Sequence, residues 1–82
     1  MEEIDTRKIE FWKDQFKIIN WNDEFSLDKK SLIDFQSNKQ VVCSRLGQVV
    51  FTKQEREQLI AQFRGSEREH VEDLIQRYAL KD

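Results

Sequence analysis

The fold of this chain is decided by residues 52–80, which read TKQEREQLIAQFRGSEREHVEDLIQRYAL. Thr52 and Glu55 have the spacing of a capping box, in which each side chain accepts a hydrogen bond from a free backbone N–H at the start of a helix. A helix is therefore expected from Thr52 to about Phe63. Its inward side chains are Leu59, Ile60 and Phe63.

A second helix is expected directly after the first. Gly65 suits a left-handed helix stop, and Ser66 and Glu69 repeat the capping-box spacing. This helix runs to about Leu80, and its inward side chains are Val71, Leu74, Ile75 and Tyr78. Asp73 and Arg77 are four residues apart, in the order that favours an ion pair on one helix face. Residues 52–80 thus predict a helical hairpin.

Two further helices are predicted in the N-terminal half. The first covers residues 6–19, with Asp5 or Thr6 as its cap, and the second covers residues 27–36, with Ser26 as its cap. The first carries one apolar stripe at helical spacing, formed by Ile9, Trp12, Phe16 and Ile19 and widened by Phe11 and Ile18. The second has a smaller apolar side, formed by Leu32 and Phe35 with Leu27, and Ile33 is a further candidate for it. Ser37-Asn38 is expected to end this helix.

Residues 40–51 have a different character. Val41-Val42-Cys43 and Val49-Val50-Phe51 are β-prone runs on either side of a turn that contains Gly47. Such runs predict a β-hairpin, which must pack on the helices because an isolated hairpin is marginally stable. The alternative is a continuous buried helix from about 40 to 50. The predicted fold class is therefore α+β and helix-dominated, with two N-terminal helices, a short β-hairpin at about 40–51 and a C-terminal helical hairpin.

Composition restricts the class of function. The 82 residues make one domain over 1–82, and its core is modest at this length. Residues 1–41 carry seven basic and nine acidic side chains, and residues 42–82 carry seven of each. This balance argues against strong binding to nucleic acid, which needs clustered Lys and Arg. The acidic start, Met1-Glu2-Glu3-Ile4-Asp5, lacks the apolar run of a signal peptide or membrane span, so we expect a cytoplasmic protein without membrane insertion.

Residues suited to catalysis are scarce. The chain has one cysteine, Cys43, and one histidine, His70, whereas a structural zinc site needs about four ligands at local spacing. Nothing in the sequence brings Cys43 and His70 together as nucleophile and base, and Cys43 lies in an apolar run where an inert thiol is the ordinary outcome. We expect no catalytic residue, no metal and no cofactor. An enzymatic or redox role for Cys43 is kept as an alternative.

The C-terminal helical hairpin resembles a helix-turn-helix DNA reader in the spacing of Ala61, Gly65, Val71 and Leu74. This alternative, a transcriptional regulator that uses residues 52–80, would bind nucleic acid through Lys53, Arg64 and Arg68. Two departures count against it. Arg64 stands where such proteins usually have an apolar residue, and the second helix opens with carboxylates that would repel phosphates. A plain helical hairpin is the favoured interpretation.

Aromatic residues are concentrated near the N-terminus, where they either belong to the core or anchor a binding partner. The core interpretation, in which these side chains wrap the hairpin, is the ordinary one. However, the stripe described above occupies one side of its helix, and Trp21 and Phe25 lie in a charged, loop-like stretch. Aromatic side chains are enriched at binding hot spots. The candidate partner-binding residues are Phe11, Trp12, Trp21 and Phe25.

The expected function is that of a small non-catalytic regulator, inhibitor or adaptor. It would act by binding another protein, including the cytosolic part of a membrane protein, and blocking it. Small stand-alone regulators of this kind are common in bacteriophages and mobile elements. Self-association through the exposed apolar surface, giving a homodimer or another oligomer, is a further alternative.

Overall fold

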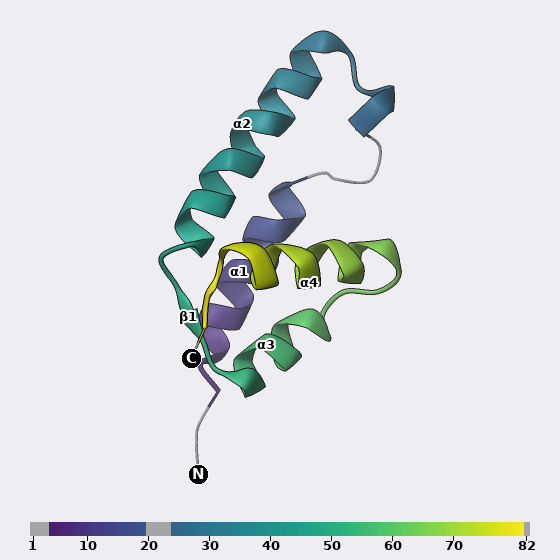
Figure 1. The fold of residues 1–82 in the computed structure, drawn as a ribbon. Coiled ribbons are helices and arrows are strands. Elements are labelled where there is room, and N and C mark those ends of the chain that lie inside the picture. The colour runs from purple at the N-terminus through teal and green to yellow at the C-terminus, as the bar shows by residue number, and fades with distance from the viewer. Residues whose placement is uncertain (1–3, 20–23, 82) are drawn as a thin grey trace.

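The computed structural model describes residues 4–19 and 24–81 and confirms a helix-dominated α+β fold (Figure 1). The elements follow one another as α1 (Thr6–Ile18), the 3-10 helix η1 (Glu24–Ser26), α2 (Lys29–Leu46), β1 (Val50–Phe51), α3 (Lys53–Ile60), α4 (Ser66–Tyr78) and β2 (Leu80–Lys81).

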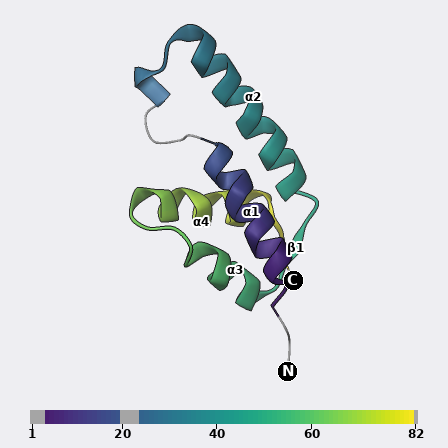
Figure 2. The same cartoon turned by 180° about the vertical axis from the view of Figure 1, so that it is seen from behind.

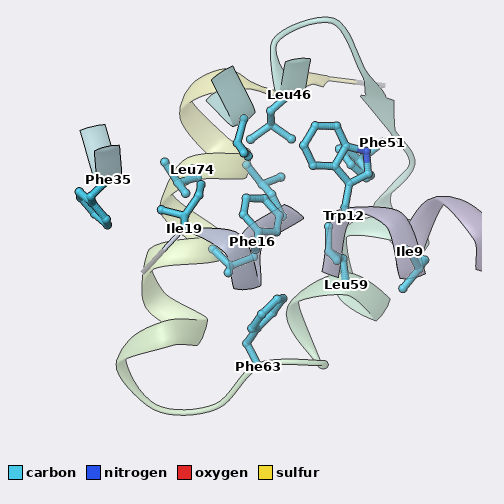
Figure 3. Close-up of a cluster of buried hydrophobic side chains, with 13 residues drawn as sticks. Ile9, Trp12, Phe16, Ile19, Phe35, Leu46, Phe51, Leu59, Phe63 and Leu74 are labelled. Carbon is cyan, nitrogen blue, oxygen red and sulfur yellow. The ribbon is translucent and has the colours of Figure 1, made fainter. Parts of the chain in front are cut away.

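The core is built around α1. Asp5 is its N-cap and accepts hydrogen bonds from the backbone N–H groups of Arg7 and Lys8. The predicted stripe is confirmed, because Ile9, Trp12, Phe16 and Ile19 are all buried. Phe11 and Ile18, which were expected to widen it, are exposed. Phe16 is fully buried in the middle of the cluster, and its ring centroid lies 5.8 Å from that of Trp12 and 6.0 Å from that of Phe63 (Figure 3). The cluster consists of Ile9, Trp12, Phe16, Ile19, Phe35, Val42, Leu46, Phe51, Leu59, Phe63, Val71, Leu74 and Ile75.

The predicted hairpin at 40–51 is wrong, because α2 continues through its first half to Leu46. The alternative of a helix across this region is correct as far as that residue. Phe35, Val42 and Leu46 form the buried side of α2. The helical spacing of this buried side is interrupted in the sequence by Lys39, which stands between Phe35 and Val42. Lys39 is half-buried, and its Nζ lies 6.0 Å from the Phe35 ring centroid.

The bounds of the predicted second helix, 27–36, are corrected at both ends. Asp28 is the N-cap in place of Ser26, and its carboxylate accepts a hydrogen bond from the Ser31 N–H at 2.7 Å. Ser37 and Asn38, read as the end of the helix, are exposed and lie within α2. Polar side chains on the solvent side of a helix do not end it, since its stability comes from the buried side.

The strand propensity of Val49-Val50-Phe51 is satisfied by a different partner. β1 pairs in parallel with β2, so that Val50 is opposite Leu80 and Phe51 is opposite Lys81. Parallel strands need a long crossover connection, and α3 and α4 together provide it. Phe51 is buried against Trp12, with their ring centroids 6.0 Å apart, whereas Val50 is exposed.

The predicted helical hairpin is confirmed in α3 and α4, with corrections to its bounds and caps. α3 ends at Ile60, before the expected Phe63, so Gly65 is not its left-handed stop. Leu80 belongs to β2, and Tyr78, which was expected to face inward, is exposed. Thr52 and Glu55 form the capping box, with both hydrogen bonds at 3.1 Å, and Arg77 pairs with Asp73 at 3.2 Å. The second capping box, at Ser66, is absent because Gly65 occupies the N-cap position of α4 and Ser66 is already helical. Gly65 has a φ of 64°, which favours glycine.

The molecule is elongated, with extents of 48 × 25 × 20 Å. In Figure 1 the C-terminal half of α2 packs beside α4, and its N-terminal half extends past α1 and α4 to η1. The view from behind shows the same projection (Figure 2). We call η1 and the first turns of α2, residues 24–34, the projecting end.

Candidate functional site

Apolar side chains left on the surface lie mainly on α1, η1 and α2. Among the described residues, the large hydrophobic side chains that remain exposed are Ile4, Phe11, Ile18, Phe25, Ile33, Val41, Val50, Tyr78 and Leu80. Single exposed apolar residues are normal on any protein, whereas a group of them on one element indicates a binding surface. Two such groups are present, one on the outer side of α1 and one on the projecting end.

The structure separates the sequence-predicted anchor residues. Phe25 is completely exposed at the projecting end, and Phe11 is 44% exposed on α1 with its ring edge-on to Trp12. Trp12 itself is 2% exposed and packs in the core, so its side chain is not available to a partner. Trp21 lies outside the described residues.

The projecting end combines apolar side chains with charged side chains of both signs, since residues 24–34 hold two basic and three acidic residues. Phe25 and Ile33 are exposed there. The lysines Lys29 and Lys30 are exposed as well, and so are Asp28 and Asp34. Over its whole length α2 carries four basic side chains, Lys29, Lys30, Lys39 and Arg45, against one acidic one, Asp34. Its net charge of +3 leaves −5 for the rest of a chain whose total is −2. The overall charge balance therefore conceals a basic helix, which a count by halves of the chain did not reveal.

A shallow groove of about 250 Å³ lies along the inner side of the projecting end. Ile18 lines it from the end of α1, and Leu27 and Phe35 line it from the start of α2 and the segment before it. Ser31, Asp34 and Asn38 form its polar edge. Its apolar floor and small volume suit one or two apolar side chains better than a complete small-molecule ligand.

Cys43 lines a second, open hollow of about 470 Å³ between α2 and the end of α4, with Gln36, Lys39, Gln40, Ser44 and Tyr78. The thiol is half-buried. Burial raises its pKa, and the nearby Lys39 ammonium only partly offsets this effect. The thiol is therefore mostly protonated at neutral pH, which makes it a weak nucleophile.

Lys8 forms a polar junction under α1 that sequence reasoning missed. Its Nζ donates hydrogen bonds to the Val50 carbonyl oxygen and to Glu55 Oε1, the latter at 3.1 Å, and it lies 4.6 Å from the Phe51 ring centroid. Burial by itself would raise the pKa of Glu55. The hydrogen bonds from the Thr52 N–H and from Lys8 outweigh burial, so the carboxyl pKa lies below its ordinary value. This junction ties α1 to β1 and α3 and thereby fixes which side of α1 faces outward.

The residues of the nucleic-acid alternative do not gather into one patch. Lys53 is the first residue of α3, Arg64 lies in the turn, and Arg68 is in the first turn of α4, all three exposed. The same first turn carries Glu67 and Glu69. Lys53 also lines a hollow between α3 and α4 together with Glu72. Carboxylates therefore lie among all three cations.

The described residues, 4–19 and 24–81, hold no group of three or more His, Cys, Asp or Glu side chains placed to bind a metal ion. Within the same ranges, no helix has both the length and the apolar character needed to cross a membrane.

Comparison with known proteins adds no relative. The chain matches no protein-family model, no curated protein sequence and no solved structure at a significant level.

Proposed function

We propose that this protein is a small non-catalytic regulator that binds another protein through the projecting end and blocks it. The observation that carries the proposal is the complete exposure of Phe25 on a segment where Ile33 and two lysines are exposed as well. Burying a phenylalanine side chain gains roughly 2–3 kcal/mol. A contact of this kind has an apolar anchor and a charged rim, as protein–protein interfaces do.

The charges of the projecting end indicate the chemistry of the partner. Lys29 and Lys30 lie about one helical turn before the exposed Ile33. The exposed Asp28 and Asp34 lie next to them in sequence, so the complementary surface has an apolar pocket with both acidic and basic groups at its edge. Such a surface exists on many cytosolic proteins and on the cytosolic parts of membrane proteins. The proposal places the protein in the cytoplasm and in the class of inhibitors that phages and mobile elements encode.

A capture experiment with matched variants tests the proposal. The immobilised full-length chain is exposed to lysate of its native host, and retained proteins are identified by mass spectrometry. We expect a partner that is lost with Phe25→Ala and with Lys29→Glu/Lys30→Glu, and kept with Val50→Ala. Val50 is also apolar and exposed, but it lies on β1. Binding of the purified partner that is indifferent to both projecting-end variants would refute the proposal.

The same protein preparation tests the nucleic-acid alternative. The chain is mixed with duplex DNA at low salt, where phosphate contacts are strongest. We expect no shift of the DNA band. A salt-sensitive shift that disappears when Lys53, Arg64 and Arg68 are replaced by alanine would favour a transcriptional regulator instead.

A further inference from the structure

The hollow beside Cys43 has no part in the function proposed for the projecting end. Its volume of about 470 Å³ lies within the range of roughly 300–1,000 Å³ that is typical of small-molecule sites. Five of its lining side chains come from α2, and Tyr78 closes it from the last turn of α4. Apart from the Cys43 thiol, all of these side chains are polar or phenolic. We call this space the α2–α4 hollow.

The lining residues of α2 form one face of the helix. Gln36, Gln40 and Ser44 follow one another at intervals of four residues, and Lys39 and Cys43 follow at the same interval beside them. From Gln36 to Ser44 this face is about 12 Å long, at 1.5 Å per residue. The two glutamine side chains are exposed, and each amide presents both a donor and an acceptor. Such groups suit the hydroxyls of a sugar and the edge of a heterocyclic base.

Lys39 is the one charged side chain among the described residues that line the α2–α4 hollow. It is half-buried, and within residues 4–19 and 24–81 its ammonium group forms no ion pair. Lys39 precedes Leu46, the last residue of α2, by seven residues, or about 10 Å along the axis. The partial negative charge of a helix C-terminus is confined to the last turn. It therefore does not oppose an anion at Lys39.

Tyr78 lies toward the other end of the α2–α4 hollow. A Cβ added to Gly47 would lie 3.5 Å from the Tyr78 carbonyl oxygen, so α4 ends beside the C-cap of α2. The Tyr78 side chain is 44% exposed, so part of its ring is open to a planar ligand. Nucleic-acid bases stack on aromatic side chains whatever their sequence, because every base has a π-face. The hollow thus offers a cation toward one end, an aromatic ring toward the other and amide groups along its wall.

We propose that the α2–α4 hollow binds a nucleoside monophosphate, with the phosphate at Lys39 and the base stacked on Tyr78. The amides of Gln36 and Gln40 supply hydrogen bonds to the ribose and the base. With one cation and one stacking ring in an open site, the expected dissociation constant is roughly 10 µM to 1 mM. The proposal does not depend on the function of the projecting end, because the hollow lies at the other end of α2.

Isothermal titration calorimetry of the full-length chain with the four ribonucleoside monophosphates tests the proposal. Inorganic phosphate and the four free nucleosides are titrated separately. We expect at least one monophosphate to bind, and phosphate or the matching nucleoside alone to bind at least about tenfold more weakly. Lys39→Gln and Tyr78→Leu should each weaken the binding at least about tenfold. Lys30→Gln is the matched control, because it changes an exposed lysine of α2 outside the hollow, and it should leave the affinity unchanged.

Protection of Cys43 gives a second measurement. Alkylation of its thiol by iodoacetamide at about pH 8.5 should slow when the nucleotide is bound, because the thiol lines the occupied hollow. Far-UV circular dichroism and the urea midpoint show whether each variant is folded. Phe25→Ala should bind the nucleotide as the wild type does, which separates this result from the test of the projecting end.

Three results would overturn the proposal. The first is that none of the four monophosphates binds or protects Cys43 at about 5 mM. The second is that inorganic phosphate binds as tightly as the nucleotide. The third is that folded Lys39→Gln or folded Tyr78→Leu binds with the affinity of the wild type.

Discussion

Replacement of Lys8 by methionine is the most informative single change in this fold. Methionine has a side chain of similar length and removes the ammonium group. The substitution therefore removes the two hydrogen bonds that Lys8 donates, to the Val50 carbonyl oxygen and to Glu55, together with the contact of the ammonium with the Phe51 ring.

The size of the effect follows from burial. The side chains of Lys8 and Glu55 are 22% and 10% exposed, so the pair lies between a surface ion pair, worth up to about 1 kcal/mol, and a buried one, whose disruption costs about 3–5 kcal/mol. We expect Lys8→Met to lower the free energy of unfolding by about 2 kcal/mol. A domain of this size has a total of about 4–12 kcal/mol. The melting temperature should then fall by roughly 8–16 °C.

Urea unfolding at neutral pH measures the loss, with Lys17→Met as the matched control. Lys17 is an exposed lysine of the same helix, and its replacement should cost only a few tenths of a kcal/mol. In a double-mutant cycle with Glu55→Gln, the two changes together should cost about 1 kcal/mol less than their sum. If the free energy of unfolding of Lys8→Met lies within about 0.5 kcal/mol of that of Lys17→Met, the junction does not hold α1 against β1 and α3.

Four further outcomes follow from the same contacts. Thr52→Ala should cost about 1 kcal/mol in urea unfolding and Ser66→Ala less than about 0.5 kcal/mol, because only Thr52 caps a helix; equal losses would contradict the cap assignment. Gly65→Ala should cost about 1–3 kcal/mol from backbone strain alone, since no heavy atom lies within 4 Å of the added methyl group. Phe16→Ala should cost about 3–5 kcal/mol, measured as a lower urea midpoint. The lowered pKa of Glu55 stabilises the fold above the ordinary carboxyl pKa of 4.5, and this stability is lost as the pH falls through the lower folded value. Glu55→Gln should therefore lose less stability than the wild type when the pH falls from about 6 to about 3.

The candidate site was predictable in part. The sequence left open whether Phe25 and Phe11 belong to the core or to the surface, and both are exposed. Burial of Trp12 also follows from its place in that stripe, so including it among the anchor residues conflicted with the helical spacing. The basic character of α2 was not predicted, because the sequence divided this helix into a helix over 27–36 and a hairpin over 40–51. Its basic residues were therefore never counted on one element.

The sequence by itself determined the local features of this protein. The apolar stripe of α1, the capping box at Thr52 and the ion pair on α4 each consist of residues that follow one another at intervals of three or four positions, so spacing alone predicts them. The length of α2, the pairing of β1 with β2 and the junction at Lys8 were decided by the tertiary structure. Val50 meets Leu80 across 30 residues, and Lys8 meets Glu55 across 47. Contacts over such separations depend on how the helices pack, and only that packing shows that residues 40–46 gain more as the buried end of a helix than as a strand.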